Sequence, residues 1–220
     1  IGISHNADGS VYEGSWHNNQ MSGDGKITYH NGDVYEGGFV DGKRQGFGTV
    51  TFEGGGRYEG PFLEGHYHGE GILFKAEGTQ YKGGFKAGKK HGEGEFMYAD
   101  GSRHRGSYLN DLRDGEGEFL KSNGDLYKGG FRKGTRSGYG HITYNNGDIY
   151  EGEFHNDMRD GKGTIHFVDG VRYEGVFDYG EPSPDGTYYY SDKSEYSGET
   201  REFVWHGFGR LKNSDGTIYE

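Results

Sequence analysis

Aromatic and apolar residues alternate with polar residues in short stretches of this chain, and the stretches recur at a constant interval. One stretch of each interval opens with tyrosine, has glycine two residues later, and has an aromatic residue two residues after that. The tyrosines are spaced by 23 residues, or by twice that where His104 takes the place of one: Tyr12, Tyr35, Tyr58, Tyr81, Tyr127, Tyr150, Tyr173, Tyr196 and Tyr219. An interval of this length is typical of tandem structural repeats.

A second stretch in each repeat has two glycines around one residue and then an apolar position, as in Gly46-x-Gly48-x-Val50. Alternation at a spacing of two predicts strands, and turns such as Asn31-Gly32 are strong hairpin signals. We therefore predict two short strands per repeat, for example residues 33–40 and 46–52, joined by a loop. The predicted fold is all-β: an elongated, twisted single sheet of tandem antiparallel hairpins with almost no helix.

The glycines and rings of these stretches lie on a common face, because residues two apart in a strand point the same way. Glycine weakens a strand unless something packs over it. A ring that lies across a neighbouring glycine covers bare backbone and buries one side of the ring. We therefore expect the rings of one strand to cover glycines of its neighbour.

The composition agrees with a thin repeat structure. The chain has 46 glycines, only 30% hydrophobic residues and 16% aromatic residues, and this aromatic content argues against disorder. It has no cysteine, so disulfides and thiolate metal sites are excluded. We find neither an apolar run of about 18 residues nor a secretory leader, and we expect a cytoplasmic location.

The pattern Tyr-Glu-Gly-x-Phe, followed by Gly-x-Gly and a glycine turn, resembles the MORN (membrane occupation and recognition nexus) repeat. The best matches are residues 35–39, 150–154 and 173–177, and the resemblance covers nearly the whole chain. It implies a twisted sheet of hairpins and a scaffolding role, often at cytoskeletal structures. It also implies dimerisation through an array end, a partner peptide or helix along the aromatic groove, or phospholipid binding, as alternatives within the family.

The period assigns residues 1–220 to a single array of about nine repeats, with cut repeats at 1–11 and 219–220. We therefore expect the chain to be a segment of a longer repeat protein.

Residues 178–206 depart from the repeat pattern. Pro184 replaces a glycine and Thr200 replaces the aromatic residue. This region is either a worn terminal repeat or a kink or dimer contact. The second interpretation predicts self-association through aromatic residues near the array end, namely Phe203, Trp205 and Tyr196.

Local motifs do not indicate catalysis. Residues 83–90 read G-x-x-x-x-G-K-K, but a phosphate-binding loop needs Ser or Thr after the lysine and then a helix. His66 and His68 form H-x-H, yet His68 occupies a repeat column, so a loop role is the simpler interpretation. No nucleophile triad or carboxylate pair stands out from the columns. We expect no enzyme activity, no catalytic residue, no cofactor and no metal.

The charge distribution suggests one further surface. The net charge is -11, which disfavours nucleic-acid binding. Residues 82–136, however, carry 12 basic and 8 acidic side chains. In the position after the tyrosine, the basic row Lys82, Arg105 and Lys128 interrupts a row of glutamates. This row is either a solvated ladder or a site for an acidic partner or an anionic phospholipid.

Three functions are consistent with these observations. The first is a non-catalytic, cytoskeleton-associated scaffold that binds protein partners and forms a homodimer through an array end. The second is a peripheral phospholipid-binding module that uses the basic row, and the third is the regulatory repeat segment of a larger enzyme. For the scaffold we predict a partner-binding aromatic face, made of Tyr12, Trp16, Tyr35, Phe39, Tyr58, Phe62, Tyr81, Phe85, Tyr127, Phe131, Tyr150, Phe154, Tyr173 and Phe177.

Overall fold

The computed structural model describes residues 1–201 and 203–220, which form two compact units, Ile1–Leu112 and Arg113–Glu220. Unit 1 contains β1 (Gly2–His5), β2 (Val11–His17), β3 (Gln20–Thr28), β4 (Val34–Val40), β5 (Lys43–Thr51), β6 (Gly56–Leu63), β7 (His66–Tyr67), β8 (Gly69–Lys75), β9 (Gln80–Lys86), β10 (Lys89–Met97) and β11 (Arg103–Leu109). β12 (Leu112–Leu120) begins at the last residue of unit 1. Unit 2 continues with β13 (Leu126–Arg132), β14 (Thr135–Thr143), β15 (Ile149–His155), β16 (Met158–His166), β17 (Arg172–Asp178), β18 (Glu181–Tyr189), β19 (Glu195–Arg201), β20 (Val204–Lys212) and β21 (Ile218–Tyr219).

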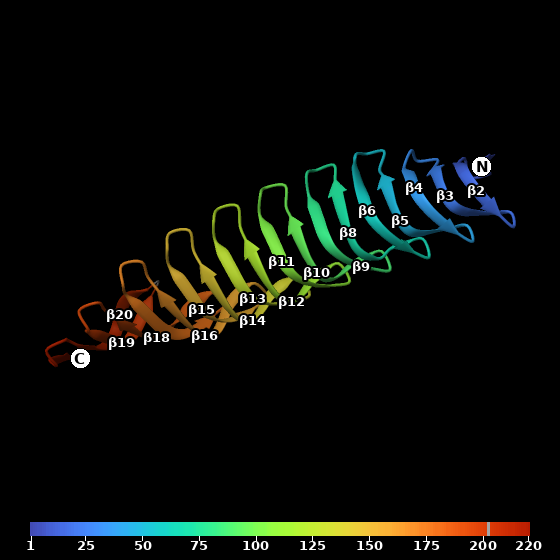
Figure 1. Ribbon diagram of the computed structural model, residues 1–220. Coiled ribbons are helices and arrows are strands. Elements are labelled where there is room, and N and C mark those ends of the chain that lie inside the picture. The colour runs from blue at the N-terminus through green and yellow to red at the C-terminus, as the bar shows by residue number, and fades with distance from the viewer. Residues whose placement is uncertain (202) are drawn as a thin grey trace. The chain divides into compact units, whose positions relative to one another are not determined.

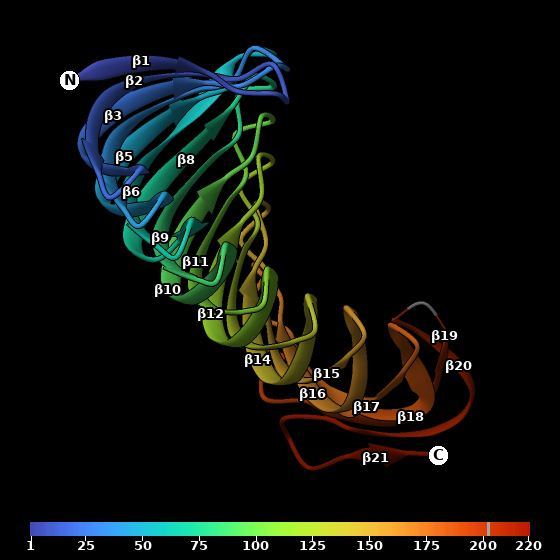
Figure 2. The ribbon, with the colours of Figure 1, turned by 90° about the vertical axis from the view of Figure 1, so that its right-hand side faces the viewer.

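Each unit is an open antiparallel sheet of consecutive hairpins (Figure 1). Strands pair with their neighbours in the sequence, as β4 does with β3 and β5, and β15 with β14 and β16. Figure 2 shows the strands of unit 1 side by side in chain order. No helix, and hence none able to span a bilayer, occurs among the residues that the structure describes. The prediction of an all-β fold of tandem antiparallel hairpins is confirmed.

The turn within each hairpin is shorter than expected. β4 and β5 are joined by Asp41 and Gly42 alone, with φ of 49° and 78°. Positive φ at both central residues of a two-residue turn matches the twist of the flanking strands. β5 therefore starts at Lys43, and the predicted loop before residue 46 is in fact part of the strand.

The two glycines of each Gly-x-Gly pair have different roles, which corrects the expectation that both lie under rings. In β5 the pairing register with β4 shifts between Gly37–Gly48 and Phe39–Arg44, so that a bulge forms. Gly46 lies in this bulge with φ of 75°, and a Cβ atom there would meet nothing within 4 Å. The first glycine thus provides a left-handed backbone conformation, whereas the second lies under a ring.

A tyrosine ring covers the second glycine and its partner across the sheet, as predicted. Gly48 is paired with Gly37, and a Cβ at Gly48 would lie 2.5 Å from a ring carbon of Tyr35. A Cβ at Gly37 would lie 2.6 Å from the Tyr35 hydroxyl. Equivalent contacts recur at Tyr12, Tyr58, Tyr81, Tyr127, Tyr150, Tyr173 and Tyr196. The tyrosine ring can therefore lie flat on the sheet only because both positions lack a side chain.

The tyrosine rings connect successive repeats. The Tyr35 ring packs edge-to-face against Phe39 of its own strand at 5.2 Å and against Phe62 of the next repeat at 4.9 Å. Such geometry is favourable because the positive ring edge meets the negative ring face. The Tyr35 hydroxyl donates a hydrogen bond of 2.9 Å to the carbonyl of Gly38, so the polar atom of this buried side chain is satisfied. Burial raises the pKa of Tyr35 to about 12.

Replacing Gly48 by alanine is expected to destabilise the protein by about 1–3 kcal/mol, because the new methyl group overlaps the Tyr35 ring. The φ of Gly48 is not in the left-handed region, so the effect is one of packing. The matched control is Gly54→Ala, where the added atom meets nothing within 4 Å. Urea unfolding of the two variants measures the difference, and equal stability would contradict the ring-on-glycine account.

Candidate partner-binding surface

The aromatic residues predicted to bind a partner form the core instead of the surface. Thirteen of the fourteen are at most 5% exposed, whereas Trp16 is 41% exposed. The structure brings them together on one side of each unit, which we call the aromatic face. A partner that docks on this face would therefore meet the side chains that lie above these rings.

One side chain per hairpin occupies the position nine residues after the tyrosine column, and in most repeats it is paired with the aromatic residue of the first strand and lies over the tyrosine. We call this set the cover row: Met21, Arg44, Tyr67, Lys90, Arg113, Arg136, Arg159, Pro182 and Trp205. Arg44 lies 5.5 Å from the Tyr35 ring centre, and Tyr67 stacks on Tyr58 at 3.8 Å. Five of the nine positions are basic, so the cover row places cations on the aromatic face.

The arginines of the cover row also connect one hairpin to the next. The guanidinium of Arg159 lies over Tyr150 and over Phe177 of the next repeat, at 5.5 and 4.9 Å. Its Nη2 donates a hydrogen bond of 2.6 Å to the carbonyl of Gly180 in the following turn. Arg44 makes the corresponding bond to the Gly65 carbonyl at 2.6 Å. These arginines therefore combine cation–π contact with a charge-assisted hydrogen bond.

A second, half-buried row borders the cover row on the aromatic face. Its aromatic members pack against the core clusters or against rings of the same face, and we call them the rim row: Tyr29, Phe52, Tyr98, Tyr144, Phe167 and Tyr190. Lys75 and Lys121 occupy the same repeat position. The accessible part of the aromatic face thus consists of ring edges and cationic groups that packing holds in place.

The cover row is absent from the predicted site residues, although the sequence contains a signal for it. Basic residues recur nine positions after the tyrosine, at the same 23-residue interval as the rings. The predicted strands end at residue 40 and resume at residue 46, so the sequence pattern does not reveal that Phe39 pairs with Arg44.

The predicted basic row lies on the opposite face and is interleaved with acids. Glu95 is the cross-strand partner of both Lys82 and Arg105. Lys128 forms an ion pair with Glu118 at 2.8 Å. A hollow of about 460 Å³ beside Lys82 and Arg105 is also lined by Glu70, Glu93 and Glu95. The row therefore carries mixed charge at close range, and lipid binding through it stays a prediction.

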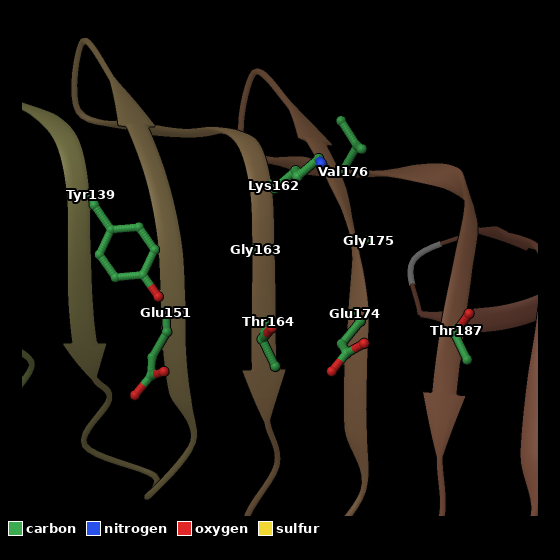
Figure 3. A pocket seen from close by; sticks show the side chains of 9 residues that line it. All are labelled: Tyr139, Glu151, Lys162, Gly163, Thr164, Glu174, Gly175, Val176 and Thr187. Carbon is green, nitrogen blue, oxygen red and sulfur yellow. The ribbon is translucent and has the colours of Figure 1, made fainter.

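A second shallow hollow on the opposite face belongs to unit 2 (Figure 3). Its volume is about 520 Å³, and its floor is the backbone around Gly163 and Gly175. Lys162 and Val176 border one end, and carboxylates border the other. One of these carboxylates is that of Glu151, whose Oε1 lies 3.1 Å from Nδ1 of His141, within hydrogen-bond distance. The hollow contains none of the residues predicted to bind a partner.

The three residues predicted for self-association pack within unit 2. Tyr196 is buried under the Trp205 ring at 4.4 Å, and Trp205 Nε1 donates a hydrogen bond of 2.7 Å to the Tyr190 hydroxyl. Phe203 contacts the Tyr173 ring edge-to-face at 5.4 Å. Trp205 remains 45% exposed. The structure thus places these rings near one another, and contact with a second copy stays a prediction.

The described residues contain no cluster of side chains suited to bind a metal ion. Across 1–201 and 203–220 there is no group of three or more His, Asp or Glu side chains arranged to hold a metal ion. The expectation that the protein is not an enzyme stays a prediction.

Comparison with known proteins identifies the repeat. The sequence pattern of the MORN repeat matches seven consecutive segments, at residues 12–34, 35–57, 58–80, 81–103, 104–126, 127–149 and 150–172. This is two fewer than the nine that the period suggested. β17 to β20 nevertheless continue the same pairing register with altered residues. A search of curated proteins gives no match.

Comparison with solved structures gives, among others, three structures of two domains, all of low sequence identity. The wild-type TCP10 domain of Danio rerio CPAP in complex with a peptide of STIL is 14% identical, with 99% of this chain and 96% of that chain covered and a TM-score of 0.51. The same domain without the peptide is 15% identical, with 99% and 97% covered and a TM-score of 0.48. The Drosophila melanogaster SAS-4 TCP domain is 15% identical, with 69% and 82% covered and a TM-score of 0.44.

Replacing Arg159 by alanine is expected to destabilise unit 2 by about 2 kcal/mol, because the cation–π contacts and the hydrogen bond to Gly180 are lost together. Lys162→Ala, an exposed change on the opposite face, is the control and should alter stability by less than about 0.5 kcal/mol. Chemical denaturation measures both variants. If Arg159→Ala were as stable as the control, the contacts of the cover row between hairpins would not contribute to stability.

Proposed function

This chain belongs to the MORN repeat family, and we propose that it is a non-catalytic protein-interaction scaffold whose aromatic face binds a segment of another protein. The observation that carries the proposal is the cover row above the buried rings. The cations of the cover row and the ring edges of the rim row are partly accessible to solvent, and contacts with the buried rings fix their positions. Arginine and aromatic residues are enriched at protein interfaces because they offer large contact areas with polar groups.

The similar fold of the CPAP TCP10 domain supports a peptide as the partner. That domain is in complex with a peptide of STIL, so an open β-array of this kind is compatible with peptide binding. An unpaired sheet face with fixed side chains needs little reorganisation when it binds, and this favours affinity.

A cytoplasmic, cytoskeleton-associated location is part of the proposal and rests on the resemblance to other MORN arrays. Self-association rests on the exposed Trp205 ring near the last full hairpin. A homodimer would present two aromatic faces to one partner and so increase the effective concentration of binding sites.

Substitutions on the two faces test the proposed partner-binding surface. The double variant Phe52→Ser/Tyr144→Ser removes rim-row rings, whereas Phe47→Ser/Tyr139→Ser removes exposed rings from the opposite face. In quantitative affinity capture from cells of the source organism, we expect the rim-row variant to retain less than about a tenth of the partners that wild type captures. The opposite-face variant should retain them. Equal behaviour of the two variants would contradict the proposal.

Light scattering of wild type against Trp205→Ala tests the homodimer. The expected result is a dimer for wild type and a monomer for the variant, because aromatic side chains carry much of the energy of such interfaces. Phe208→Ala is the control, since this ring is 88% exposed on the opposite face. A monomeric wild type would rule out self-association through this end.

A further inference from the structure

Lys90 differs from the other cations of the cover row. In four repeats an arginine of this row donates a hydrogen bond to the carbonyl of the turn 21 residues later, as Arg44 does to Gly65. The turn itself is the same at Lys90, because the amide of Asp111 donates to the Lys90 carbonyl at 3.0 Å, as that of Gly65 does to Arg44. The Lys90 ammonium, however, has no hydrogen-bond or ion-pair partner within bonding distance in the described part of the chain.

The Lys90 ammonium is instead surrounded by rings. Its Nζ lies 4.7 Å from the centre of Phe96, 5.5 Å from that of Tyr108 and 5.6 Å from that of Tyr81. Ring faces attract a cation, but they offer no lone pair to the three N–H donors of an ammonium group. Burial lowers the pKa of Lys90 from its usual value. The ammonium is thus partly dehydrated, and its N–H groups have no acceptor in the described part of the protein.

This ammonium opens into a hollow on the aromatic face of unit 1, which we call the Lys90 hollow. Its volume is about 320 Å³, at the lower end of the roughly 300–1,000 Å³ of ligand pockets. Apolar walls come from Tyr67, Leu73 and Phe96, and polar groups come from Lys75, Thr79 and Asp111.

The charges in the hollow favour an anion. Two ammonium groups face one carboxylate there, that of Asp111. The Asp111 Oδ1 accepts a hydrogen bond of 2.9 Å from the backbone amide of Lys90 and none from its ammonium, which the nearby carboxylate attracts only through its charge. Lys75 pairs with Glu77 at 3.6 Å. Lys90 is therefore the cation in the hollow with unfilled bonding capacity.

We propose that the Lys90 hollow binds an acidic peptide segment in which a glutamate or aspartate adjoins a large apolar side chain. The carboxylate accepts a hydrogen bond from Lys90 Nζ, and the apolar side chain packs against Tyr67, Leu73 and Phe96. The inference rests on the proposed function and specifies the chemistry of the partner at one repeat. A charge-assisted bond in a partly dehydrated hollow is stronger than one at the open surface.

The test uses two probes, acetyl-Phe-Glu-Leu-amide and its neutral match acetyl-Phe-Gln-Leu-amide, titrated into the whole chain and followed by amide chemical shifts. We expect the acidic peptide to bind roughly tenfold more tightly and to shift the amides of Lys75, Lys90 and Asp111. Equal binding of the two peptides, or shifts confined to other repeats, would overturn the proposal.

Two substitutions at position 90 distinguish a hydrogen bond from Lys90 Nζ to the peptide carboxylate from long-range electrostatic attraction of the peptide. Lys90→Met removes the cation and should abolish the preference for the acidic peptide. Lys90→Arg keeps the charge, but its guanidinium can donate to the Asp111 carbonyl as Arg44 does to Gly65. Lys90→Arg should therefore lose the preference while remaining at least as stable as wild type. Lys26→Met, an exposed change on the opposite face and outside the basic row, should retain it.

The possible outcomes distinguish this inference from the proposed function. If Lys90→Arg retains the preference, or Lys26→Met loses it as fully as Lys90→Met does, long-range charge is responsible and the inference fails. The rim-row capture experiment is independent, because its substitutions lie outside the Lys90 hollow. If the rim-row variant loses its partners but the whole chain binds the acidic and neutral peptides equally, the proposed scaffold function stands and only this inference fails.

Discussion

The contact between a tyrosine ring and a pair of facing glycines is the constraint on which every repeat depends. A single open sheet has no second layer to bury its side chains. The ring solves this by lying flat on backbone that carries no Cβ, so that a tyrosine such as Tyr35 is fully buried against one sheet. Its hydroxyl reaches the carbonyl of Gly38, and its edges meet the rings of two repeats. One side chain thus links the backbone, the bulge and the neighbouring hairpin.

Because the rings are used in this way, the core and the binding surface cannot be the same residues. Thirteen rings that the sequence suggested as a binding face are covered almost completely. The surface that a partner meets is one layer above them and is made by residues that themselves stabilise the array. Arg159, for example, holds two hairpins together while it presents a cation. On the aromatic face the accessible groups therefore also stabilise the array, whereas pairs such as Lys128 and Glu118 lie on the opposite face, away from the rings.

The sequence predicted the hairpins well because alternation and glycine turns are local signals. It could not show which aromatic residues remain exposed, because alternation identifies a face but not what lies above it. The bulge at Gly46 was missed for a similar reason. A glycine that provides positive φ and a glycine under a ring look identical in a repeat column. Without the bulge and the two-residue turn, Arg44 could not be placed opposite Phe39, and the cover row stayed hidden.

The cover row accommodates several kinds of side chain over the same tyrosine position. The tyrosine below needs only a flat or cationic group above it, so Arg44, Tyr67 and Lys90 serve in consecutive repeats. Where Pro182 provides neither, Phe203 from the following turn covers Tyr173 instead. Since each choice preserves the ring-on-glycine contact, the fold places little restriction on the chemistry that the aromatic face presents. Arrays with the same architecture can therefore present different side-chain chemistry on this face through one position per repeat.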